Sequence, residues 1–192
     1  MKAALKAVAN ALAFAAVSPL VLAFYVRAGI LGPNRALEGS SALISMFPGL
    51  TGMFLRRAFL RCVLAKCHAT VDIGFGTLFS QTGTILEENV YIGPRCHLGL
   101  CHLQKDVLLA AGVHVPSGGK THAFADPDTP IREQGGARTM VTIGAGAWVG
   151  SAAIVLADVG AGTVVGAGSV VTKPLPANAI AAGVPAKVIR LR

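Results

Sequence analysis

The chain has 192 residues, of which only 14% are charged and 53% are hydrophobic. This length allows one sizeable core, hence one domain plus an appendage, and the charge is low for a free-floating globular protein, which favours a membrane or a large subunit contact. The net charge of +8 is uneven, because residues 1–67 carry eight basic residues against Glu38 alone, whereas residues 68–192 are nearly balanced. Basic residues interleaved with apolar ones favour an anionic lipid surface, and no nucleic-acid-binding motif accompanies them.

Residues 7–26 form an apolar run of twenty residues without a charge, between Lys6 and Arg27. Twenty helical residues span about 30 Å, the thickness of a bilayer core. Pro19, near the middle of the run, removes one helical hydrogen bond. We therefore expect residues 1–67 to be a helical, membrane-associating segment. It is either a kinked span or, preferably, a helix-break-helix that dips into one leaflet and returns; a cleaved signal peptide is the alternative.

A turn is expected at Gly32-Pro33-Asn34, and Ser40 and Ser41 are typical N-cap residues, so the next helix should begin after them. A further basic amphipathic helix is expected over residues 51–66. It either caps the end of the following domain or lies on lipid headgroups. Its basic side chains share one side: Arg56, Arg57 and Arg61.

From residue 71 the pattern changes to a period of six, in which an aliphatic residue recurs with a shorter residue two positions before it. Such a period fits neither a helix nor a plain strand, but it fits a solenoid in which one short strand and one corner take six residues. The step from Val155 to Val159 is only four residues, which predicts a pinched coil or a register shift there. The recurring residues are Leu86, Ile92, Leu98, Leu103, Leu109 and Val115, then Ile143, Val149, Val155, Val159, Val165 and Val171.

Four cysteines are present, and Cys96 and Cys101 fall on inward positions of the repeat, where a small apolar side chain is wanted. The adjacent His97 and His102 point outward, because successive side chains of a strand alternate in direction. We therefore expect reduced cytosolic thiols rather than a zinc site. The other two cysteines are Cys62 and Cys67.

Four motifs complete the pattern: Lys120-Thr121-His122, Ala147-Trp148-Val149-Gly150-Ser151, Gly166-Ala167-Gly168-Ser169-Val170-Val171-Thr172-Lys173 and Gly183-Val184-Pro185-Ala186-Lys187-Val188-Ile189-Arg190. With the repeat, they resemble the hexapeptide-repeat acyltransferases, in particular the galactoside, maltose and polysaccharide O-acetyltransferases. The resemblance covers residues 71–190. It implies a mainly β fold, a left-handed parallel β-helix over residues 68–176 with an extended loop at 116–140 and a tail at 177–192.

The resemblance implies transfer of an acetyl or acyl group from coenzyme A to a hydroxyl, with His122 as the general base. An imidazole, with a pKa near 6.5, suits this role at neutral pH. His114, on an outward position near the loop, is the other candidate base. Asp126 and Asp128 are candidates for orienting His122. We expect direct transfer within a ternary complex, without an acyl-enzyme.

By the same resemblance, acetyl-CoA or another acyl-CoA is the co-substrate, no metal takes part, and the protein is a homotrimer. Small residues let the pantetheine arm approach the backbone, Ser151 lies at the donor end, and basic residues face the phosphates. The residues matching cofactor contacts are Trp148, Ser151, Ala167, Thr172, Lys173, Lys187 and Arg190.

These observations predict a membrane-associated O-acyltransferase acting on a sugar, such as a lipid-linked or surface-polysaccharide precursor, at the cytoplasmic face of the inner membrane. Two other functions stay open. One is a metal hydratase like the γ-class carbonic anhydrases, which the separation of His97 and His102 suggests. The other is a non-catalytic trimeric scaffold.

Overall fold

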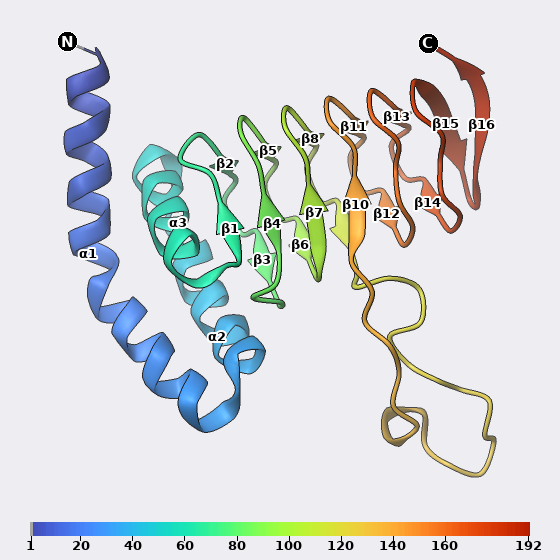
Figure 1. Cartoon of the computed structure of the whole chain (residues 1–192), viewed down its shortest axis with the longest axis horizontal. Coiled ribbons are helices and arrows are strands. Elements are labelled where there is room, and N and C mark those ends of the chain that lie inside the picture. Colours follow the sequence, from blue (N-terminus) through green and yellow to red (C-terminus); the bar gives the residue numbers. More distant parts are fainter. Residues whose placement is uncertain (1) are drawn as a thin grey trace.

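The computed structural model describes residues 2–192 and consists of three helices followed by a β-solenoid (Figure 1). The helices are α1 (Lys2–Leu31), α2 (Pro33–Ser45) and α3 (Gly49–Val63). The short parallel strands of the solenoid stack along its long axis, with the helices at one end and the C-terminus at the other. The predicted fold class, a parallel β-solenoid behind an N-terminal helical segment, is confirmed.

The strands form three sheets, one for each side of the solenoid. Sheet A contains β1 (Lys66–Cys67), β4 (Ile85–Leu86), β7 (Cys101–Leu103) and β10 (Val141–Ile143). Sheet B contains β2 (Asp72–Ile73), β5 (Tyr91–Ile92), β8 (Leu108–Leu109), β11 (Trp148–Val149), β13 (Val164–Val165), β15 (Ala179–Gly183) and β16 (Ala186–Leu191). Sheet C contains β3 (Leu78–Phe79), β6 (His97–Leu98), β9 (His114–Val115), β12 (Ile154–Val155) and β14 (Val170–Val171).

The recurring aliphatic residues fill the interior of the solenoid, as the period of six predicts. All twelve are buried, and the small residues two positions before them, such as Ala147 and Ala153, are buried beside them. Burying such a column of Val, Ile and Leu side chains stabilises the stack by roughly 1.5–3 kcal/mol per residue. The coils therefore hold together through a continuous apolar core as well as through backbone hydrogen bonds.

The irregular steps of the repeat all fall at the corner between sheet C and sheet A. Val159 continues sheet A in register, since it bridges Ile143 on one side and Leu175 on the other. Of the two expectations for the step after Val155, the register shift is therefore wrong, and the coil is instead shortened at this corner, whose length varies from coil to coil. The loop of residues 116–140, with a short 3-10 turn at Ile131–Glu133, is an insertion at the same corner.

Helix α1 continues through Pro19 without a break, although it bends in its middle (Figure 1). The chain reverses at Gly32 instead, where a φ of 85° suits a residue without a side chain. The preferred helix-break-helix centred on Pro19 is therefore wrong. One face of α1 packs on α2 and α3 through Val17 and Phe24, and the hydroxyl of Tyr25 donates a hydrogen bond of 2.7 Å to the carbonyl of Cys62.

Ser40 and Ser41 do not cap a helix, because α2 already begins at Pro33, where the missing N–H of proline costs nothing. Both serines are buried in the middle of α2. The hydroxyl of Ser41 accepts a hydrogen bond of 2.8 Å from the backbone N–H of Phe79. Helix α2 is therefore bonded directly to the first strand of sheet C.

Helix α3 covers the N-terminal end of the solenoid with two buried arginines. Within the stack, each coil donates its N–H groups to the carbonyls of the next coil, as in the 2.9 Å bond from Asp72 N–H to the Val90 carbonyl. The carbonyls of the first coil have no preceding coil to bond. Arg56 Nε donates to the Ile73 carbonyl at 2.9 Å, and Arg57 Nη1 donates to the Val71 carbonyl at 3.1 Å.

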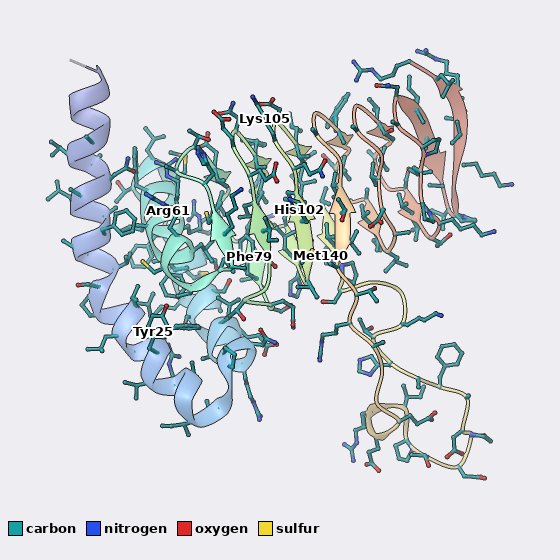
Figure 2. The ribbon with its side chains drawn as sticks, in the orientation of Figure 1. Tyr25, Arg61, Phe79, His102, Lys105 and Met140 are labelled. Carbon is teal, nitrogen blue, oxygen red and sulfur yellow. The ribbon has the colours of Figure 1, made fainter. Side chains whose placement is uncertain are left out.

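Arg56 and Arg57 are each only 2% exposed, and burial lowers the pKa of both guanidinium groups. Their charges face the solenoid, which favours the capping interpretation of this helix over headgroup binding for these two residues. Arg61 is exposed and lies over the ring of Phe14 at 5.0 Å (Figure 2). By length and composition, the described chain has one helical stretch able to cross a bilayer, Ala7–Leu31.

Candidate functional site

The outward side chains of sheet C form a ladder across the coils, and two of them are histidines. His97 on β6 is the register partner of His114 on β9, and His114 is the partner of Ile154 on β12. The imidazole rings of His97 and His114 are 5.8 Å apart between centroids and inclined by 65°. Stacking of the coils thus brings together two residues that are distant in the sequence.

The loop of residues 116–140 is a folded-back arm rather than an irregular excursion. Its two halves are joined by backbone hydrogen bonds from Thr139 N–H to the Ser117 carbonyl at 2.9 Å and from Ala137 N–H to the Lys120 carbonyl at 2.8 Å. Gly136 allows this pairing, because a side chain there would collide with the carbonyl of Thr121. This backbone pairing holds His122, the residue after Thr121, near the base of the arm.

Sheet C, the arm and α2 together enclose an open cleft of about 400 Å³, which we name the histidine cleft. It contains both candidate bases and His97, together with an acidic residue that the sequence analysis did not single out. That residue is Glu38 on α2. The sequence holds one indication of its importance, because Glu38 is the single acidic residue among the first 67. The lining includes Glu38, His97, His114, Ser117, His122 and Arg138.

The surroundings of His97 disfavour its protonation. Burial lowers the pKa of His97, the neighbouring His114 lowers it further, and Glu38 opposes this by raising it. Asp126 does not serve the histidines: its carboxylate accepts hydrogen bonds from the Asp128 N–H at 2.9 Å and from the Thr129 hydroxyl at 2.7 Å. These bonds lower the pKa of Asp126 and commit the carboxylate to its own turn.

Several residues that match cofactor contacts gather along the corner between sheets B and C. Ser151 and Ala167 occupy this corner on adjacent coils, where the Gly168 N–H donates to the Ser151 carbonyl at 2.8 Å. Gly150 lets the coils approach, since a side chain there would lie 2.5 Å from the nitrogen of Ala167. Lys187 joins the same region from β16, where it pairs with Ala182.

The remaining matched residues lie to either side of that corner. Trp148, on β11 of sheet B, is 50% exposed. Arg190 lies on the outer strand β16 opposite Ile180. Thr172 and Lys173 are exposed and follow β14, at the other side of sheet C. The fold thus brings Trp148, Ser151, Ala167 and Lys187 into one region, with Thr172 and Lys173 across one strand.

The cysteines and the other histidines do not assemble a metal centre. His102, on β7 of sheet A, forms a 2.8 Å hydrogen bond with Glu87 and faces a different side from His97 (Figure 2). Burial raises the pKa of the inward Cys101 thiol to about 12. Within residues 2–192, no three His, Cys, Asp or Glu side chains converge as metal ligands would. The separation of His97 from His102 removes the observation that suggested a hydratase.

No family model and no curated protein matches the chain by sequence. Solved structures do match it by fold. A maltose O-acetyltransferase from Clostridium difficile 630 superposes with a TM-score of 0.68 at 22% identity, over 82% of this chain and 87% of the other. A galactoside acetyltransferase in complex with coenzyme A gives a TM-score of 0.65 at 22% identity, over 82% and 80%.

A third match is a hexapeptide-repeat acetyltransferase from Vibrio cholerae O1 biovar eltor in complex with acetyl coenzyme A. Its TM-score is 0.61 at 17% identity, over 85% of this chain and 91% of the other. The covered shares exceed the solenoid alone, so the likeness includes part of the helical segment. At these identities the likenesses show that the chain has the β-solenoid fold of these transferases, and they show the fold alone.

Proposed function

We propose that the protein transfers an acyl group from acyl-CoA to a hydroxyl of a sugar, with His122 as the general base. The observation that carries the proposal is the ladder of sheet C. On this ladder His114, which lines the histidine cleft, is the register partner of Ile154. Ile154 lies on the strand that follows the Ser151 corner. His122 at one edge of sheet C, and Ser151 and Ala167 at its other edge, support this proposal in a fold found in acetyltransferases with bound coenzyme A or acetyl coenzyme A.

The reaction needs a base because a sugar hydroxyl is a poor nucleophile. His122 accepts the hydroxyl proton while the oxygen forms a bond to the thioester carbonyl carbon. A hydrogen-bond donor beside the Ser151 corner stabilises the oxyanion, an effect of about 3 kcal/mol per donor. The intermediate then expels the thiolate of coenzyme A, which receives the proton from His122. The ester bond formed replaces the thioester bond broken, so no acyl-enzyme is required.

Coenzyme A fits the matched contact residues by shape and charge. The small side chain of Ala167 lets the thin pantetheine arm lie against the backbone. Lys173, Lys187 and Arg190 are exposed cations of the kind that hold the phosphates. The exposed indole of Trp148 offers an apolar surface beside the arm.

The first experiment measures transfer of labelled acetyl-CoA to a panel of sugars and lipid-linked sugars by detergent-purified protein. His122→Ala is compared with wild type, and His102→Ala, on sheet A, is the matched control. Transfer that falls at least a hundredfold in His122→Ala and persists in His102→Ala supports the proposal. Equal loss in both variants, or binding of no coenzyme A by the wild type, contradicts it.

We further propose that the helices rest in the membrane interface, so that the acceptor is lipid-linked. The outer face of α1 exposes Leu12, Leu22 and Ile30, and nearby Leu43 and Leu50 are exposed as well. Apolar grooves of about 320 and 300 Å³ lie beside this face, where α1 meets α3 and α2. An exposed apolar area of this kind on a segment of net charge +7 suits an anionic lipid surface.

The packing of α1 favours an in-plane position over a span. The middle of α1 is buried through Val17 and Phe24 against helices that Arg56 and Arg57 tie to the first coil. A helix crossing the bilayer would draw this polar, hydrogen-bonded end of the solenoid into the hydrocarbon, which is costly.

Flotation on vesicles containing phosphatidylglycerol tests the membrane proposal. The double variant Leu12→Glu/Leu22→Glu should lose most of its binding, because each exposed leucine contributes roughly 1.5–3 kcal/mol on burial. Ile189→Glu, an exposed apolar position on β16, is the control. Unchanged flotation of the double variant refutes an interface made by this face.

We also propose a homotrimer in which sheet B contributes to the contact. Its outward ladder includes the exposed Tyr91, Leu108 and Trp148, which are adjacent in register. Such an apolar stripe is typical of a subunit interface. Analytical ultracentrifugation of wild type and Leu108→Glu measures it, and a wild-type monomer at micromolar concentration contradicts it.

A further inference from the structure

His97 and His114 have no role in the proposed chemistry, yet they form the floor of the histidine cleft. The rest of the outward ladder of sheet C is aliphatic, with Leu78, Ile154 and Val170 at the equivalent positions. Two adjacent imidazoles in an otherwise aliphatic row therefore stand out. Of this row, the described lining of the cleft includes His97 and His114 alone. The two histidines therefore lie in the part of the row that α2 and the arm enclose.

The two histidines bond to the stack through their backbone, which leaves the ring nitrogens available to a ligand. The backbone N–H of His97 donates to the Val113 carbonyl at 3.0 Å, and that of His114 donates to the Ala153 carbonyl at 2.9 Å. Both side chains point outward and are exposed, and both line the cleft. A neutral imidazole offers one N–H donor and one nitrogen acceptor, which is the pattern that a hydroxyl group matches.

The charged side chains that line the cleft balance each other, because Glu38 faces it from α2 and Arg138 from the arm. Glu38 projects from α2, which is fixed to the first coil by the Ser41 hydroxyl and by the side chain of Asn34, whose Oδ1 accepts from the Thr82 N–H at 3.0 Å. A carboxylate accepts hydrogen bonds from hydroxyl groups and repels negative charge. Because the carboxylate of Glu38 and the guanidinium of Arg138 balance in charge, and the floor consists of two imidazoles, the cleft is matched to the hydroxyl groups of a neutral ligand.

We propose that His97, His114 and Glu38 form an acceptor-binding site that holds neighbouring hydroxyl groups of a neutral saccharide beside His122. This inference rests on the proposed acyl transfer and adds to it the substrate class and the residues that position the sugar. It also makes α2 a wall of the site, so that the helical segment contributes to sugar recognition as well as to the lipid surface.

Sugar binding can be measured without acyl transfer, by saturation-transfer NMR with maltose and methyl β-galactoside in the presence of coenzyme A. The test variant is His97→Phe/His114→Phe, which keeps two aromatic rings on the ladder and removes their hydrogen bonds. Each bond lost weakens binding by about two- to tenfold, so the double variant should bind roughly five- to a hundredfold more weakly. Glu38→Gln should also weaken binding, and its loss of charge should admit anionic sugars.

His102→Phe is the matched control, because it is an outward histidine of the same solenoid on another sheet. Unchanged coenzyme A affinity and melting temperature in the test variants separate a binding role from a structural one. The inference is overturned if wild type binds neither sugar, if the double variant binds as wild type does, or if methyl glucuronide binds more tightly than methyl β-galactoside. His122→Ala should keep sugar binding while losing transfer, so failure of the proposed function is distinguishable.

Discussion

Replacing Arg56 by methionine should destabilise the protein, because the guanidinium completes the hydrogen bonding of the first coil. Its Nε donates to the Ile73 carbonyl at 2.9 Å, and its Nη1 donates to the Phe47 carbonyl at 2.6 Å. Methionine fills a similar volume but leaves both carbonyls without a donor. Stranding the buried Ile73 carbonyl costs about 1–3 kcal/mol and stranding the partly exposed Phe47 carbonyl adds a smaller amount, while the variant recovers part of this by no longer burying a charge.

We take the net loss as about 3 kcal/mol, which for a chain of this size lowers the melting temperature by about 6–12 °C. Circular dichroism of the detergent-solubilised protein measures it. Arg61→Met, an exposed arginine on the same helix, is the control and should change the melting temperature by less than about 2 °C. If Arg56→Met melts with wild type, the guanidinium does not replace the missing coil, and the capping interpretation fails.

Three further predictions concern other parts of the molecule. Lys187→Glu should weaken coenzyme A binding by about tenfold or more in a titration, whereas Lys105→Glu, on a distant corner, should not; equal effects would indicate unspecific charge attraction. Iodoacetamide at pH 8, followed by mass spectrometry, should modify the half-buried Cys62 before Cys101, whose burial raises its pKa to about 12; early labelling of Cys101 would mean that the core opens. The pKa of Glu87 is lowered chiefly by its hydrogen bond to a histidine, so its stabilising contribution is present above the ordinary glutamate pKa of about 4.3 and is lost as pH falls below it. Glu87→Gln should therefore lose less stability than wild type between pH 5 and pH 3, and parallel losses would show that the bond contributes nothing.

The solenoid could be predicted from the sequence because burial imposes its period directly. An inward position accepts only an aliphatic or a small residue, so the repeat from Leu86 to Val171 records the core coil by coil. The corner lengths could not be interpreted in the same way. From the sequence alone, the four-residue step after Val155 indicates a distorted coil. In the structure this step lies at the corner between sheets C and A, where every irregular step of the repeat falls.

The histidine cleft could not be predicted from spacing, because its members come from three separate segments. Glu38, His97 and His122 meet only when α2 packs on sheet C and the arm folds back. The arginines of α3 posed a different difficulty. A cationic stripe on an amphipathic helix has the same pattern whether it meets phosphates or backbone carbonyls, so Arg56 and Arg57 fitted both interpretations equally.

The covered N-terminal end of the solenoid limits how copies of it can associate. An uncovered terminal coil would present a row of unpaired backbone groups to which another molecule could add, and repeated addition would produce filaments. Here α3 occupies the first coil, and at the other end β16 folds back antiparallel onto β15. The α3 end is therefore closed to the addition of another solenoid, which leaves the sides of the coils and the C-terminal end as the surfaces at which copies could meet.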